Sequence, residues 1–158
     1  MLKVSKGVEQ GVFVLLMLAL QKDHTPVKSN ILSDTLSVSD SYLKKILRKL
    51  VVAGLISSNA SKDGGFQLKK SIEKISFLDV CMALDPIKEI ELQNMQLANH
   101  IFPNDPEHVK KSEQTVIDVF SKGTEAFYKE LKAVSLAKLL KEEKYTEGTI
   151  NWVKQLEK

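Results

Sequence analysis

The sequence has 158 residues, enough for one domain with a hydrophobic core or for a small domain that carries an oligomerisation arm. Its 43% hydrophobic and 27% charged residues are usual for a soluble globular protein, and it contains no internal repeat or low-complexity tract. Cys81 is the only cysteine, which excludes an intramolecular disulfide bond and favours a reducing, cytoplasmic compartment.

Charge is distributed unevenly along the chain. Residues 1–70 contain eleven Lys and Arg against five Asp and Glu, a net charge of +6, whereas residues 71–158 contain twelve against fifteen, a net of −3. A basic first half joined to a mildly acidic second half is typical of a nucleic-acid-binding head on a protein-facing body, although chance clustering of solvated lysines would give the same totals.

The first predicted helix covers about residues 6–21. Its apolar run, residues 11–20, follows two lysines as the core of an export signal would, but it is too short to span a bilayer and lacks a persuasive cleavage site. We therefore expect a buried helix. Pro26 then breaks the pattern, and Ser29 is placed to cap a second helix with Ile31, Leu32 and Leu36 facing inward.

A third helix follows the short turn SVS. Ser39 is a favourable N-cap, and Gly54 is placed to end the helix in a left-handed conformation. One face carries leucines and an isoleucine at three-and-four spacing, which predicts burial of Leu43, Ile46, Leu47 and Leu50. Four cations remain on the outer faces, where they can reach phosphates and base edges: Lys44, Lys45, Arg48 and Lys49.

Two alternating segments, residues 55–60 and 66–70, predict an antiparallel hairpin with Gly64 and Gly65 at its tip. The glycines permit positive φ and close backbone approach, and Lys62 at such a tip would touch a phosphate or a minor groove. The helix–turn–helix and hairpin together predict a winged helix, an architecture that places the third helix in a DNA major groove.

Beyond the hairpin, Ser76 and Asp79 have capping-box spacing and open a short helix ended by Pro86. Cys81 on that helix is interpreted as a small core residue, with a redox sensor as the alternative. A helix and loop are expected over residues 87–106, and Ser135 and Thr149 are candidate caps for short segments near the C-terminus.

One long helix is predicted over about residues 107–134. Its apolar positions recur at nearly heptad spacing, and they predict a dimer interface because a small head cannot cover the stripe alone. The candidate interface residues are Val109, Val116, Phe120, Gly123, Phe127 and Leu131.

With these residues in view, the chain resembles the Rrf-two family of bacterial winged-helix regulators, which includes IscR, NsrR and CymR. The resemblance covers nearly the whole chain and is carried by LKVSKG, SVSDSYLKKILRKLVVAGLI, GGFQL, ISFLDVCMALDP and VSLAKLL. It implies a homodimer in which long helices cross and two heads read a palindromic operator, usually to repress. It also implies that Ser39, Tyr42 and Leu43 begin the recognition helix.

Two departures from the family pattern stand out. The family often has an arginine at the base of the wing, whereas this chain has Asn59–Asp63, with Asp63 an anion where DNA would approach. Members that bind an iron–sulfur cluster carry three cysteines between the post-wing and long helices, and residues 87–111 contain none. We therefore expect a cluster-free member with no cofactor, in which His100 and His108 would make at most a weak metal site.

The predicted fold is mainly α with a small β wing, with a winged helix-turn-helix DNA-binding domain at residues 1–85 and a dimerisation helix and C-terminal helical segment at residues 86–158. The expected partners are double-stranded DNA, a second copy of the chain, and a small-molecule effector or partner protein. No membrane contact is expected. The candidate DNA-binding residues are Lys6, Lys28, Ser39, Ser41, Tyr42, Lys44, Lys45, Arg48, Lys49, Lys62, Gly64 and Gly65.

The function predicted is that of a sequence-specific DNA-binding transcriptional regulator, a repressor by resemblance. The alternative is a winged-helix protein-interaction module that regulates a partner without specific DNA binding, and Asp63 and the acidic second half motivate it. An enzyme is not expected, because the sequence shows no phosphate loop, zinc spacing, nucleophile elbow or acid–base constellation.

Overall fold

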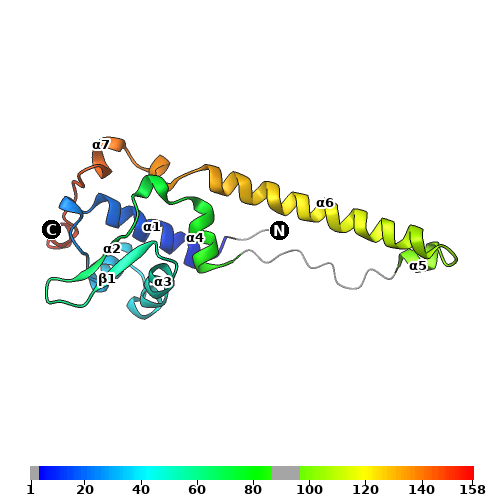
Figure 1. The fold of residues 1–158 in the computed structure, drawn as a ribbon. Coiled ribbons are helices and arrows are strands. Elements are labelled where there is room, and N and C mark those ends of the chain that lie inside the picture. Colours follow the sequence, from blue (N-terminus) through cyan, green and yellow to red (C-terminus); the bar gives the residue numbers. More distant parts are fainter. Residues whose placement is uncertain (1–3, 87–96) are drawn as a thin grey trace. The chain divides into compact units, whose positions relative to one another are not determined.

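The computed structural model describes residues 4–86 and 97–158, which belong to two compact units (Figure 1). The head comprises residues 1–86 and 132–158, and the arm comprises residues 87–131. The C-terminal segment therefore belongs to the head, and the predicted division into residues 1–85 and 86–158 separates two parts that pack together. The fold class, mainly helical with a two-stranded wing, is confirmed.

The head begins with three α-helices, a hairpin and a fourth helix, joined by short 3₁₀ turns. These elements are α1 (Lys6–Leu20), η1 (Lys22–His24), α2 (Ser29–Leu36), α3 (Asp40–Val52), β1 (Ile56–Asn59), β2 (Gly65–Leu68), η2 (Ile72–Lys74) and α4 (Phe77–Leu84). Three short C-terminal elements complete it. They are η3 (Leu136–Leu139), α7 (Glu142–Tyr145) and α8 (Trp152–Leu156).

The core of the head forms around α1, as its apolar run predicts. Ser5 caps this helix by accepting a hydrogen bond from the Val8 backbone N–H. Most of its residues are buried, and α3, α4 and β2 all contact it. Its almost continuous hydrophobicity follows from this central position, because neighbours surround nearly its whole circumference.

The helix-turn-helix is formed by α2 and α3. Ser37 adopts a left-handed conformation (φ 53°) in the turn, and Ser39 caps α3 as predicted. At the other end, Gly54 has φ 72°, and the N–H groups of Gly54 and Leu55 bond the carbonyls of Val51 and Leu50, respectively. This is a Schellman motif, and it turns the chain directly from α3 into the wing.

The predicted cap of α2 is wrong by one residue. Lys28 occupies the N-cap position and makes no side-chain cap, whereas Ser29 is the first helical residue. The side chain of Ser29 instead makes a small contribution to lowering the pKa of Asp40, on the following helix. The helix α2 therefore begins after an extended Lys28, without the expected serine cap.

The wing is shorter than predicted but has the expected antiparallel pairing, with Ile56 opposite Leu68 and Asn59 opposite Gly65. A third segment joins it, because Val27 and Phe66 exchange both of their backbone hydrogen bonds, at 2.9 and 2.8 Å. β2 is thus held on both edges, and the base of the wing is tied to the residues that lead into α2.

α4 opens with the capping box predicted from Ser76 and Asp79. Ser76 also lies opposite Ser135 in an isolated antiparallel bridge. Ser135 does not make the predicted side-chain cap, and the segment after it is the 3₁₀ turn η3 rather than an α-helix. This bridge is where the C-terminal segment returns to the head.

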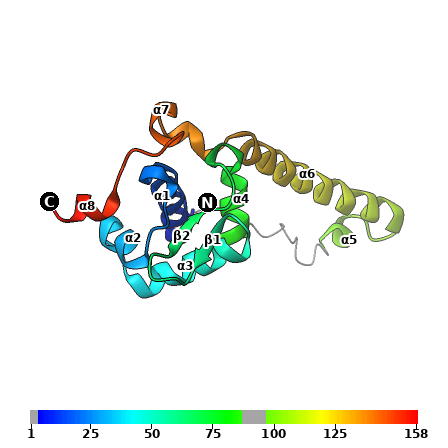
Figure 2. The same cartoon turned by 60° about the vertical axis from the view of Figure 1, so that its left-hand side comes forward.

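The C-terminal segment then packs against the end of α1. The Lys22 N–H donates to the Ile150 carbonyl at 2.7 Å, and the indole Nε1 of buried Trp152 donates to the Met17 carbonyl at 2.8 Å. Asn151, rather than the predicted Thr149, caps α8. α8 lies against α2 (Figure 2), so the end of the chain braces the first helix of the helix-turn-helix.

The arm contains the short helix α5 (Ala98–Ile101) and the long helix α6 (Pro106–Ala133), whose last residues reach the head. The bounds of α6 confirm the long helix predicted over residues 107–134. The helix expected at the start of residues 87–106 lies mostly outside the described residues. Among the helices that the structure describes, none combines the length and apolar character needed to cross a membrane.

Trp152→Ala should lower the free energy of unfolding by about 3 kcal/mol, because it leaves a cavity beside α1 and removes a buried hydrogen bond. Urea unfolding followed by circular dichroism measures the change. Val153→Ala, at an exposed neighbouring position, is the matched control and should change stability little. An equal, small loss for both variants would show that the C-terminal segment does not support the head.

Candidate nucleic-acid interface

The exposed face of α3 is centred on Ser41, Lys45 and Arg48. The side chains predicted to be buried are buried, including Leu43 and Leu47. Each residue advances an α-helix by about 100°, so Ser41, Lys45 and Arg48 point almost directly away from that apolar side. No described acidic side chain lies within salt-bridge distance of Lys45 or Arg48. The centre of this face therefore presents two cations that are free to meet another molecule.

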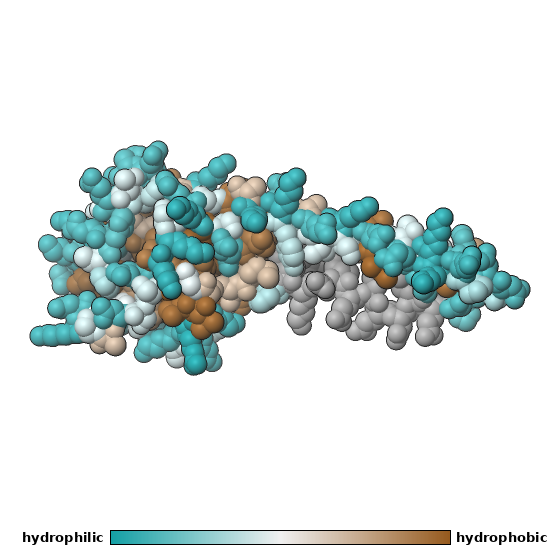
Figure 3. All heavy atoms as spheres, viewed as in Figure 1, coloured by the Kyte–Doolittle hydropathy of each residue, from teal (hydrophilic) through white to brown (hydrophobic). Residues whose placement is uncertain are grey.

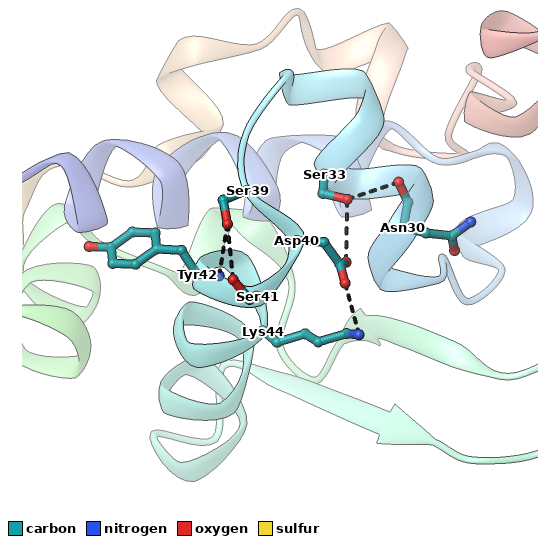
Figure 4. Close-up of polar contacts among 7 residues, drawn as sticks. All are labelled: Asn30, Ser33, Ser39, Asp40, Ser41, Tyr42 and Lys44. Carbon is teal, nitrogen blue, oxygen red and sulfur yellow. Dashed lines mark hydrogen bonds and ion pairs between the residues drawn. The ribbon is translucent and has the colours of Figure 1, made fainter.

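Lys44 is placed differently from Lys45. Its ammonium lies 2.8 Å from a carboxylate oxygen of Asp40, one helical turn earlier (Figure 4). The Ser33 hydroxyl, on α2, donates to the same carboxylate at 3.4 Å. The hydrogen bond from Lys44 is the main reason that the pKa of Asp40 lies below its ordinary value. Asp40 thus links the two helices and compensates the charge of Lys44.

Lys49 is exposed, but it bonds the neighbouring helix α4. Its ammonium donates to the Leu84 carbonyl at 3.1 Å, at the C-terminal end of α4, where the helix dipole favours a cation. The cluster of four cations seen in the sequence is therefore divided in the structure. Lys44 is paired with Asp40, Lys49 is bonded to α4, and Lys45 and Arg48 remain outward.

Tyr42 lies on the side of α3 away from the Asp40–Lys44 pair (Figure 4). Its hydroxyl oxygen is 3.3 Å from the position that a Cβ on Gly7 would occupy, so the ring extends over the first turn of α1. Lys6, exposed in that same turn, is thereby brought to the edge of the α3 surface. Ser39, at the start of α3, bonds both the Tyr42 N–H and the Ser41 hydroxyl.

Gly64 and Gly65 are required by the chain's own packing. A Cβ on Gly64 would lie 2.0 Å from the Asn59 carbonyl oxygen, and one on Gly65 would lie 2.5 Å from the Val27 carbonyl carbon. Gly65 also has φ 146°, a conformation that other residues rarely adopt. The close backbone approach predicted for these glycines is thus made to the hairpin partner and to Val27.

The wing tip and the N-terminus of α2 border one groove of about 860 Å³. Lys28 and Lys62, both predicted to bind DNA, line it together with Lys154 from α8. Asp63 and Glu157 line the same groove, so their anions offset part of this positive charge. The structure therefore joins two of the predicted residues that are far apart in sequence, and adds a third lysine.

The stripe on α6 is partly exposed within the described chain. On the face that Figure 3 shows, the arm is mostly hydrophilic with a few apolar patches. Val116, Phe120 and Phe127 are 38%, 43% and 37% exposed. Val109 is buried and Leu131 is half-buried, and a Cβ on Gly123 would meet no described atom within 4 Å. A helix that presents this many large apolar side chains to water is a candidate protein-binding surface.

The donor set does not fit an iron–sulfur cluster. Cluster ligation needs several thiolates, and the chain has one cysteine. Burial, with a smaller contribution from Asp85, raises the pKa of the Cys81 thiol, which keeps it protonated and weakly nucleophilic. Among the described residues, no three His, Cys, Asp or Glu side chains converge as metal ligands, and the His108 ring packs edge-on against Phe102.

Comparison with known proteins assigns the chain to a family with this architecture. Residues 4–142 match the model of the Rrf2 family, described as "Iron-dependent Transcriptional regulator", and the chain belongs to this family of winged-helix, DNA-binding regulators. It is 36% identical over 144 residues to the HTH-type transcriptional regulator YffB of Lactococcus lactis, a match that covers 91% of this chain and 90% of YffB. It is 42% identical over 84 residues to YwgB of Bacillus subtilis, covering 53% of this chain and 54% of YwgB.

Solved structures show the same fold at lower identity. CymR, the global cysteine regulator of B. subtilis, superposes with a TM-score of 0.59 at 20% identity, covering 88% of this chain and 96% of CymR. IscR of T. potens superposes with a TM-score of 0.61 at 22% identity, covering 97% and 96% of the two chains. The resemblance inferred from the sequence motifs is therefore confirmed at the level of family and fold.

Proposed function

We propose that the protein is a homodimeric, sequence-specific DNA-binding repressor that acts on a palindromic operator in the cytoplasm. The observation that carries the proposal is the outward ridge of Ser41, Lys45 and Arg48 on α3. These residues lie on the second helix of a helix-turn-helix, whose N-terminus Ser39 caps, and a wing follows that helix. The chain also belongs to the Rrf2 family.

In this proposal α3 enters the major groove, and Lys45 and Arg48 contact base edges. An arginine or lysine can donate two hydrogen bonds to guanine O6 and N7, which makes this the commonest specific contact. Ser41 lies close enough to the N-terminus of the helix to share the same base pairs. Their outward direction, and the lack of acidic partners for Lys45 and Arg48 among the described residues, support this assignment.

The remaining candidate residues suit phosphates better than bases. The Tyr42 hydroxyl lies near Gly7, the residue after Lys6 in the first turn of α1. Lys28 precedes the N-terminus of α2, whose dipole and backbone N–H groups favour an anion, and no side chain caps that end. Contacts of this kind fix the register of a protein on DNA without reading sequence.

Asp40 limits what Lys44 can contribute. An anion on the recognition helix repels phosphates, and the 2.8 Å pair with Lys44 cancels much of that repulsion. We therefore infer that Lys44 mainly holds Asp40 in place at the α2–α3 junction. The free cations for base contacts are Lys45 and Arg48.

Dimerisation through α6 supplies the second reading head. Two copies of the stripe would cover Val116, Phe120 and Phe127 against each other, and the closed two-fold arrangement is the commonest for such a pair. A two-fold dimer would match a palindrome whose half-sites are spaced by about one helical turn of DNA or a multiple of it. With no donor set for a cluster, a small molecule or a partner protein is the proposed effector.

Lys45→Ala and Arg48→Ala should each weaken binding to the DNA upstream of the protein's own gene by about 1–3 kcal/mol if the lost contact is to a base edge. A lost phosphate contact would instead lower the salt slope by about one unit. Fluorescence anisotropy at several salt concentrations, with competitor DNA, separates the two effects.

Lys49→Ala is the matched control for this experiment, because it removes the same charge from the same helix but from a side chain bonded to α4. Its affinity and salt slope should stay close to those of the unaltered protein. A loss of DNA affinity in Lys49→Ala as large as that in Lys45→Ala would contradict the assignment of Lys45, but not Lys49, to the DNA contact. Specific binding that no variant on α3 reduces would refute the assigned interface.

Phe120→Glu should convert the protein from a dimer to a monomer, because a charge in the centre of the stripe cannot be buried without a partner. Light scattering should give twice the 17.7 kDa chain mass for the unaltered protein and about one chain mass for the variant. Lys129→Glu, on the opposite side of α6, introduces the same residue and should leave the dimer intact. A monomeric unaltered protein at micromolar concentration would contradict the proposal.

A further inference from the structure

A cavity in the head lies at the base of the wing and is used by none of the contacts described above. It has a volume of about 500 Å³, which falls within the range of small-molecule sites. Its walls come from the end of α1, β2 and the residues after it, η2, and the C-terminal α7. The lining residues with titratable side chains are His24, Lys69, Lys70, Glu73 and Tyr145.

The charges around this cavity are not balanced. The Tyr145 hydroxyl donates to the Glu73 carboxylate at 3.0 Å, and this hydrogen bond is the main reason that the pKa of the phenol is raised. The only acidic side chain of the lining is thus already engaged. Lys69 and Lys70 have no acidic partner within salt-bridge distance among the described residues. The unpaired charge in the lining is therefore positive.

One edge of the cavity is formed by strained backbone. Asp23 and His24 have φ of 55° and 49°, a conformation that costs free energy for residues other than glycine. His24 is held there by a 2.9 Å hydrogen bond between its Nε2 and the Tyr145 carbonyl oxygen. His24, in this conformation and bonded to α7, therefore lines the cavity between segments that are distant in sequence.

We propose that this cavity binds a small metabolite that carries an oxyanion, a carboxylate or a phosphate, through Lys69 and Lys70. A carboxylate or a phosphate can accept several hydrogen bonds from ammonium groups. A small organic anion with a polar body also suits the Gln67, Ser71 and Thr146 side chains of the lining. The site lies in the head and needs neither the arm nor a second chain.

The position of the site suggests how binding would reach the DNA-facing surface. Gln67 and Leu68 belong to β2 and pair with Ser57 and Ile56 of β1. The Lys69 N–H bonds the Leu55 carbonyl, directly after the Gly54 turn that ends α3. A ligand held at Lys69 and Lys70 would thus alter the wing and the end of α3 together. This regulatory part alone rests on the proposed DNA-binding function.

The test measures ligand binding to the full-length protein without DNA. Citrate, phosphoenolpyruvate and glucose 6-phosphate are titrated, with glucose as the uncharged control, by calorimetry and by amide chemical shifts. We expect saturable binding of at least one anion, with the largest shifts at residues 67–73 and 145–146. Carboxylate and phosphate probes distinguish the two kinds of oxyanion.

Three variants test the charge argument. Lys70→Ala should weaken binding by about two- to fivefold, as expected for one partly exposed charge pair, and Glu73→Gln should strengthen it by a similar factor. Lys74→Ala removes an exposed charge nearby that does not line the cavity, and it should change nothing. Weakening by Lys74→Ala as large as by Lys70→Ala, or no saturable binding of any probe, would overturn the proposal.

The regulatory part is then tested by anisotropy with and without the anion that binds. A change in DNA affinity that Lys70→Ala reduces supports the coupling. If the anion binds but the DNA affinity is unchanged, the proposed coupling is overturned, whereas the proposed anion site still stands. Absence of specific DNA binding, with the anion still bound, refutes the proposed function and not the cavity.

Discussion

The burial of α1 is the constraint on which the rest of the head depends. α3, α4, β2 and the C-terminal segment all pack on this one helix, so the recognition helix, the wing and the cavity keep their places through it. Its first turn also carries Lys6 and supports Tyr42. The core residues of α1 make no proposed contact to bases. The helix nevertheless holds in place the elements that carry the candidate DNA-binding side chains.

Charge on α3 is arranged by its neighbours rather than by the helix alone. Asp40 compensates Lys44, and the C-terminal end of α4 accepts Lys49, which leaves the outward cations in the centre of the exposed face. Such pairing narrows the contacts that the helix can make, because a cation already bonded within the protein loses that bond when it moves to a phosphate.

Much of the fold could be predicted because its signals are local. The Ser39 cap, the Gly54 turn, the Ser76–Asp79 capping box and the apolar side of α3 each depend on residues a few positions apart. The Asp40–Lys44 pair has the same local spacing and could have been found from it.

The features that sequence reasoning missed depend on distant partners. The bond from Lys49 to the Leu84 carbonyl, and the return of Trp152 to α1, join segments whose proximity no local pattern encodes. The two wing glycines were expected from turn chemistry, yet it is the backbone of Asn59 and of Val27 that leaves no room for a Cβ at these positions. The same limit explains why the cavity, whose walls come from three separate segments of the chain, has no signature in the sequence.

The most direct test of the account is to recover the genomic DNA fragments that the purified protein selects from its own genome in the presence of competitor DNA. The account predicts fragments that share an inverted repeat, with half-site centres separated by about 10–10.5 base pairs or a multiple of that spacing. Recovery of fragments without a common sequence, by a protein shown to be folded, would contradict it.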